Sequence, residues 1–135
     1  MRTAGAQHLQ RLLQRADFLK AARASKAAFP GLVLQVRARA KDEADAGDRP
    51  RVGFTASKKV GGSVVRNRAR RRLRAVAWDV LGCRARSGHD YVLIARAATP
   101  VRPYDALLAD LSGALDRIET GKDDRRSHKP KGARP

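Results

Sequence analysis

The spacing of apolar residues along the chain predicts three amphipathic helices. Apolar residues recur every three or four positions from Leu9 to about Arg23, with basic residues between them, so we expect a helix there and leave open a break near its middle. The same spacing predicts a second helix from Val64 to about Leu81, which Gly82 ends. A third helix is predicted from Tyr104 to near Ile118.

Three strands are predicted between these helices. The segment Leu32–Arg39 alternates apolar and polar residues over its second half, and Arg51–Ala56 alternates throughout. Tyr91–Ala95 is a nearly continuous apolar run, which is typical of a strand buried on both faces. The polar segment 41–50, rich in Asp and Gly, is interpreted as a hairpin loop between the first two strands.

The order α-β-β-α-β-α predicts a small α/β sandwich, in which helices pack on a mixed sheet. A chain of 135 residues is long enough for one domain with one modest core, and we assign residues 1–119 to it. Residues 120–135 contain almost no apolar side chain, so we expect a basic disordered tail.

The net charge indicates the class of partner, and the cysteine content indicates where in the cell the protein is found. A formal net charge of +17 would make the chain repel itself unless a polyanion neutralised it, so a nucleic acid is the expected partner. The alternative is a generically basic protein or a basic tail on an ordinary domain, but the charge is concentrated in one segment. A single cysteine excludes a disulfide framework and fits a cytoplasmic location. No apolar run approaches the roughly 20 residues of a membrane span, so neither a membrane nor a secretory role is expected.

The basic segment coincides with the second predicted helix and the turn before it. Between Arg51 and Arg74 there are nine basic residues and no acidic one. At about 100° per residue, one side of the helix carries an apolar stripe of Val65, Ala69, Leu73, Val76 and Val80. The opposite side carries Asn67, Arg68, Arg70, Arg71 and Arg74, with Arg66 and Arg72 flanking.

This arrangement is typical of a surface that binds phosphates. Arginine stays charged, grips phosphate oxygens in bidentate fashion and stacks on bases. Lys58 and Lys59 add charge beside the helix N-terminus, whose free N–H groups also favour phosphate. The alternative, a merely solvated arginine face, would cost self-repulsion because no Asp or Glu lies one turn away to compensate.

Three neighbouring segments of the chain together resemble the signature of bacterial ribonuclease P proteins. They are Arg51–Gly61, Val64–Arg68 and Arg70–Arg74. The resemblance covers about residues 9–119. It implies a left-handed βαβ crossover of the ribosomal-protein-S5-domain-2-like kind, which pattern alone would not have predicted because right-handed crossovers are the rule. It also implies that the basic helix and its preceding loop bind a catalytic RNA through Lys58, Lys59, Arg66, Asn67, Arg68, Arg70, Arg71, Arg72 and Arg74.

A second surface follows from the same resemblance: a cleft between the first helix and the sheet, which receives the 5′ leader of precursor tRNA. The matching residues are Phe18, Val33, Gln35 and Tyr104. Family members commonly carry a second aromatic residue at the position of Ala22, and often a Tyr at that of Gln35. The alternative for Phe18 is a plain core residue.

The resemblance implies the protein subunit of a ribonucleoprotein endoribonuclease that matures tRNA at its 5′ end. Its expected partners are the catalytic RNA subunit and precursor tRNA, with no further protein required and no membrane. In such a complex the RNA performs the cleavage and holds most of the Mg²⁺. The main rival hypotheses are a ribosomal or other standalone RNA-binding protein, a self-sufficient nuclease and a DNA-binding regulator.

No residue of this chain is expected to be catalytic or to bind a metal. The three histidines, His8, His89 and His128, show no spacing typical of a metal site or an acid–base pair. The acidic residues lack the paired spacing of a two-metal nuclease. Trp78 and Cys83 are interpreted as ordinary packing residues.

Overall fold

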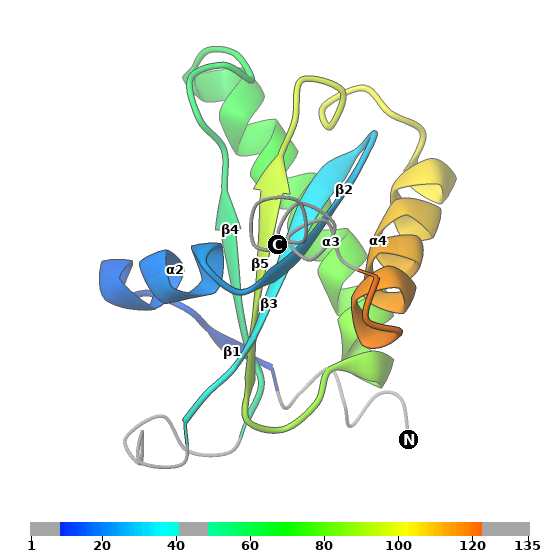
Figure 1. Cartoon of the computed structure of the whole chain (residues 1–135). Helices are drawn as coiled ribbons and strands as arrows, with labels where there is room; N and C mark the ends of the chain where they lie inside the picture. Colours follow the sequence, from blue (N-terminus) through cyan, green and yellow to red (C-terminus); the bar gives the residue numbers. More distant parts are fainter. Residues whose placement is uncertain (1–8, 41–48, 123–135) are drawn as a thin grey trace, which may run out of the picture.

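A five-stranded mixed sheet carries helices on both of its faces (Figure 1). The structure is a computed structural model, and it describes residues 9–40 and 49–122. Along the chain its elements are β1 (Gln10–Arg11), α2 (Arg15–Ala22), β2 (Ser25–Phe29), β3 (Leu32–Ala38), β4 (Arg51–Thr55), α3 (Ser63–Arg84), β5 (His89–Ala95) and α4 (Tyr104–Glu119).

The strands lie in the order β1-β4-β5-β3-β2. β4 runs parallel to β1 and β5, whereas β3 runs antiparallel to β5 and β2. α3 connects the parallel neighbours β4 and β5, and in Figure 1 it lies behind the sheet as the chain passes from β4 to β5 on its right. This crossover is therefore left-handed, against the strong general preference for right-handed ones.

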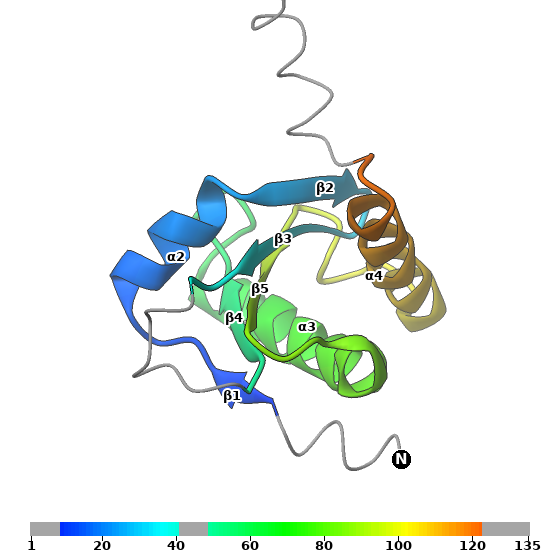
Figure 2. The same ribbon diagram turned by 60° about the horizontal axis from the view of Figure 1, so that its bottom comes forward.

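The main core lies between the sheet and the pair α3 and α4, which share one face (Figure 2). Because side chains alternate along a strand, every second residue points into this layer. Leu34 of β3 and Tyr91 and Leu93 of β5 meet Leu73 of α3 and Leu111 of α4 there, and all five are essentially fully buried.

A smaller apolar cluster lies on the opposite face, where α2 covers part of the sheet. Leu12, Ala21 and Val92 are buried there, with Phe18 and Ile94 packed against them. The ring of Phe18 lies directly on Gly53: a Cβ at Gly53 would come within 2.5 Å of the ring atom Cζ. A glycine at this position of β4 is therefore what allows α2 to approach the sheet.

The predicted fold class is confirmed, and so are all three predicted strands and the second and third helices, although the second helix continues past Gly82 to Arg84. Three other details differ. The first helix is shorter than predicted, because Gln10–Arg11 pair with β4 as a strand. β2 was not predicted, and β3 and β4 do not form a hairpin, since β5 lies between them.

Parts of two other predictions lie outside the described residues. The assigned loop 41–50 is described only at its end, and the expected tail is described only to residue 122. Across the described ranges, no helix is long and apolar enough to cross a membrane.

Candidate nucleic-acid interface

α3 has one buried side and one basic side, as predicted. Ala69, Leu73, Val76 and Val80 of the predicted stripe are buried against the sheet. Val65 is an exception, with 37% of its surface exposed. It lies in the first helical turn and packs against Gly61 instead. A Cβ added to Gly61 would lie only 2.8 Å from Cγ1 of Val65.

The opposite side of α3 is exposed and positively charged. Asn67, Arg68, Arg71 and Arg74 are exposed along it. The only acidic residue of the helix is Asp79, whose carboxylate accepts a hydrogen bond of 2.6 Å from the hydroxyl of Tyr104. We call the exposed side of α3, together with Lys58 and Lys59, the basic face.

The turn before α3 brings the two lysines to the helix N-terminus. The backbone N–H groups of Val60 and Gly61 donate to the carbonyls of Ser57 and Lys58, which closes the turn. Lys58 and Lys59 are both exposed. The N-cap residue is Gly62, so no side chain accepts hydrogen bonds from the N–H groups of the first turn. Free N–H groups and two ammonium groups thus lie at the same end of the helix, which favours anions.

Some predicted RNA-binding arginines contact the protein itself. The guanidinium of Arg72 donates to the carbonyls of Pro100 and Arg102, so it holds the loop before α4 against α3. Arg70 is half-buried and donates to Asn67 Oδ1 at 2.8 Å. Arg66 is half-buried as well, and its Nε has no hydrogen-bond partner among the described residues. Arg68, Arg71 and Arg74 are the exposed arginines of this helix side.

Phe18, Val33 and Gln35 share the α2 side of the sheet. Strand register aligns Gln35 with Val92 and Gly53 in one row, directly under the Phe18 ring. Val33 lies in the next row and is half-buried, whereas Gln35 is only 8% exposed. Phe18 is itself half-buried, so it packs on Gly53 without being enclosed in the core.

Tyr104 does not belong with these three residues, and its assignment to the same cleft is wrong. It begins α4, and its hydroxyl bonds to Asp79 of α3, on the other face of the sheet from α2. Burial together with this bond to Asp79 raises the pKa of Tyr104 to about 12. The four predicted leader residues therefore lie on two faces of the molecule.

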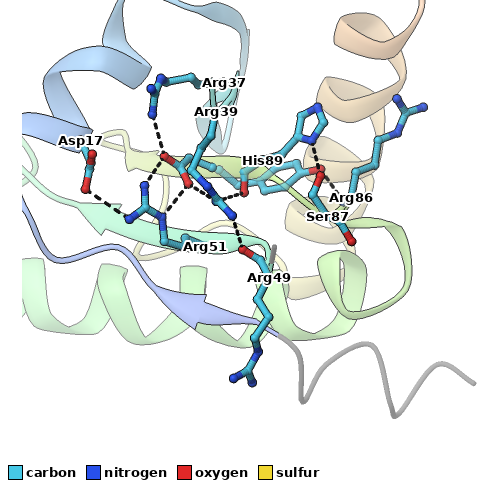
Figure 3. A network of polar contacts seen from close by, with 10 residues as sticks. Asp17, Arg37, Arg39, Arg49, Arg51, Arg86, Ser87 and His89 are labelled. Carbon is cyan, nitrogen blue, oxygen red and sulfur yellow. Dashed lines mark hydrogen bonds and ion pairs between the residues drawn. The ribbon is translucent and has the colours of Figure 1, made fainter. Parts of the chain in front are cut away.

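A buried carboxylate fixes the α2 side of the sheet at one end (Figure 3). Asp90 is fully buried and accepts hydrogen bonds from Arg39 at 2.7 Å, from Arg51 at 2.8 Å and from Arg37 at 3.2 Å. Arg51 also forms an ion pair of 3.3 Å with Asp17 of α2. This pair ties α2 to the sheet one residue before Phe18, and so it positions the Phe18 ring.

This network was not predicted from the sequence. An acidic residue directly before an apolar strand, and arginines at the ends of the two neighbouring strands, are the signal that could have revealed it. Burial raises the pKa of the Asp90 carboxyl, but the hydrogen bonds and charges of Arg51 and Arg39 outweigh burial, so the pKa lies below its ordinary value.

Three other residues singled out in the sequence, His89, Trp78 and Cys83, are also described by the structure. His89 is half-buried, and its Nδ1 lies 2.9 Å from the carbonyl of Ser87. Trp78 and Cys83 are exposed, so their interpretation as packing residues is wrong.

A pocket of about 240 Å³ lies between β3, β5 and α4, and it includes none of the predicted site residues. Among the described residues there is no group of three or more His, Cys, Asp or Glu side chains that could hold a metal ion.

The features above define the chain as a small α/β sandwich protein with a left-handed crossover helix that is basic on its outer side. Solved structures of other proteins share this fold. The ribonuclease P protein of Staphylococcus aureus superposes with a TM-score of 0.63 at 22% identity, covering 81% of this chain and 94% of that one. The corresponding protein of Thermotoga maritima gives 0.61 at 22% identity, covering 77% and 93%.

Sequence comparison identifies the family. The Ribonuclease P family model matches residues 7–119. The ribonuclease P protein component of Paramagnetospirillum magneticum is 53% identical over 114 residues, which are 84% of this chain and 85% of that protein. That of Ruegeria pomeroyi is 50% identical over 112 residues, 82% and 87% of the two chains. The chain belongs to the ribonuclease P protein family.

Membership gives the coarse function. The family comprises protein components of an endoribonuclease that acts in tRNA processing, and it implies an RNA subunit as partner. The rival assignments to a ribosomal protein and to a DNA-binding regulator are set aside by this result.

Proposed function

We propose that this protein binds the catalytic RNA subunit of ribonuclease P through the basic face. The observation that carries the proposal is the division of α3 into an apolar side that is buried from Ala69 to Val80 and an exposed side of arginines, with its single acidic residue turned toward Tyr104. A polyanion neutralises the charge that the free protein cannot compensate within this helix.

The contacts would be mainly electrostatic. Arg68, Arg71 and Arg74 are exposed and can grip phosphate oxygens, and Lys58 and Lys59 extend the same charge to the start of the helix. Phosphate contacts of this kind fix position and orientation on the RNA without reading its sequence.

We further propose that the α2 side of the sheet receives the 5′ leader of precursor tRNA. Phe18 supplies an aromatic ring that is not enclosed in the core, and Val33 and Gln35 extend from it across the sheet. Unpaired bases stack on such rings. Since Ala22 and Gln35 offer no further ring, Phe18 carries the stacking on this surface alone.

In this proposal the protein performs no phosphodiester chemistry. The RNA subunit cleaves the precursor and holds most of the Mg²⁺, as the family resemblance implies. The protein lowers the repulsion between the two RNAs and holds the leader in place.

The basic face is tested by the paired change Arg68→Ala and Arg71→Ala. Binding of a bacterial ribonuclease P RNA is measured over a series of salt concentrations. We expect weaker binding and a salt slope smaller by roughly 0.7 to 0.9 for each phosphate that the variant no longer neutralises. The matched control is Arg84→Ala, which removes an arginine of the same helix that is paired with Asp116 and Glu119 of α4. Equal affinity of the paired variant and the control would refute the assignment.

Cleavage of precursor tRNA tests the function as a whole. At low Mg²⁺, the catalytic RNA should cleave faster with this protein than without it, and the protein alone should cleave nothing. Cleavage by the protein alone would instead favour a self-sufficient nuclease.

The leader surface is tested with the assembled complex and two substrates, leader-bearing and mature tRNA. Phe18→Leu keeps an apolar side chain over Gly53 but removes the ring. The affinity for leader-bearing tRNA relative to that for mature tRNA should therefore fall by about 5- to 150-fold, the range for one base that no longer stacks. Tyr104→Phe, on the other face of the sheet, is the control and should leave the ratio unchanged. An unchanged ratio in Phe18→Leu would show that leader binding does not depend on stacking at this ring.

A further inference from the structure

Trp78 is the only tryptophan of the chain, and 40% of its surface is exposed. It lies on α3, six residues before the helix ends at Arg84. Tryptophan has a large apolar ring system, and on a protein surface it is commonly covered in part by a partner. Its exposure here therefore needs an explanation.

Helical periodicity places Trp78 within the basic face. At 100° per residue, its direction falls between those of Arg71 and Arg74. It follows Arg74 by one helical turn and Arg71 by two, which is roughly 6 Å and 10 Å along the axis. The indole thus lies at one end of the row of exposed arginines.

The charge around Trp78 suits RNA rather than an acidic or apolar protein surface. The next residue, Asp79, is bound to Tyr104 on the side of α3 that faces α4, so its carboxylate is held away from the row of arginines. A nucleotide whose phosphate contacts Arg74 has its base within one helical turn, where the indole lies. The ring offers a flat surface to any base that is not already stacked on neighbours.

We propose that Trp78 is a stacking site for an unpaired base of the RNA that binds the basic face. The inference rests on the proposed function and adds a structural requirement to it. The RNA segment on α3 is not a continuous duplex: a phosphate backbone lies along Arg68, Arg71 and Arg74, and an unpaired nucleotide lies at the Trp78 end.

The test uses the full-length protein and a bacterial ribonuclease P RNA. Since Trp78 is the only tryptophan, its fluorescence reports this position alone. We expect the RNA to quench this fluorescence and to protect the indole from acrylamide. Trp78→Ala should weaken binding by about 5- to 150-fold, the range for one base that no longer stacks, and should leave the salt slope unchanged because every phosphate-binding side chain is retained.

Two further variants separate the causes. Trp78→Phe keeps an aromatic ring and should recover most of the affinity, whereas Trp78→Leu keeps only apolar volume and should not. Thermal unfolding of each variant shows that the fold is retained.

The inference is overturned if Trp78→Ala binds the RNA with the affinity of the wild type, even if the RNA quenches the fluorescence of the wild type. It is also overturned if acrylamide still quenches the indole of the wild type in the complex. In either case the proposed function stands if the paired change Arg68→Ala and Arg71→Ala still weakens binding. If that change has no effect either, the proposed function fails.

Discussion

Replacement of Asp90 by Asn should destabilise the folded protein by about 3 kcal/mol. The carboxylate is fully buried and accepts hydrogen bonds from three guanidinium groups, of Arg37, Arg39 and Arg51. These groups are themselves largely buried. The change keeps the shape of the side chain but removes its charge, and it turns one acceptor oxygen into an amide that faces other N–H donors.

The magnitude follows from the number and burial of these hydrogen bonds. A hydrogen bond to a charged group contributes about 1.5–3 kcal/mol, and removal of one partner of a buried ion pair costs about 3–5 kcal/mol. Asparagine retains one acceptor, so Asp90→Asn lies near the lower end of that range. Asp90→Ala retains none and should lie near the upper end.

Urea unfolding followed by circular dichroism measures the change. The matched control is Asp116→Asn, which removes a carboxylate from an exposed ion pair with Arg84 and should cost less than about 1 kcal/mol. A loss in Asp90→Asn no larger than that of the control would refute the role of Asp90 as the electrostatic centre of this end of the sheet.

The same network predicts a dependence on pH. Because the folded-state pKa of Asp90 lies below its ordinary value, folding favours the ionised form. The stabilisation is therefore complete above the unfolded pKa, near 4, and is lost as pH falls through the lower folded pKa. The difference in unfolding free energy between wild type and Asp90→Asn should be constant at neutral pH and shrink below about pH 4.

Four further changes test the packing. Leu73→Ala should cost about 2–5 kcal/mol in urea unfolding because Leu73 is fully buried, and Ile94→Ala should cost less because Ile94 is half-buried. Gly53→Ala should cost about 1–3 kcal/mol by the same measurement, since its Cβ would collide with the Phe18 ring. Arg72→Ala frees the loop that precedes α4, so limited proteolysis should cut that loop faster than in wild type.

The helices and central strands could be predicted because an element that buries one face repeats its apolar residues at a fixed spacing. The stripe of α3 from Ala69 to Val80 matches the residues that the sheet covers. β5 was recognised as an apolar run because both of its faces are covered, one by α3 and α4 and the other in part by α2.

The remaining features depend on contacts between distant parts of the chain. β2 is the short segment Ser25–Phe29, whose one fully buried residue is Ala27, so it has no marked alternation. The supposed hairpin failed because β5, far later in the sequence, inserts between β3 and β4.

The candidate site shows the same division. The arginines of α3 were predicted because charge and period lie in one segment, but Arg72 contacts a loop some thirty residues away, which no local pattern shows. Tyr104 was assigned by resemblance alone, and its place beside Asp79 depends on how α4 packs on α3. The interpretation of Trp78 as an ordinary packing residue is wrong, since 40% of its surface is exposed.

The position of β5 in the middle of the sheet also determines the order in which the protein can fold during synthesis. Until His89–Ala95 has left the ribosome, β2 with β3 and β1 with β4 can form only two separate pairs. α3 is made before β5, so its arginines emerge while the sheet that will cover its apolar side is still incomplete. Closure of the sheet requires contacts between strands far apart in sequence, which form slowly. A nascent chain that stops at Arg84 therefore carries every residue of the basic face but lacks the central strand that joins the two halves of the fold.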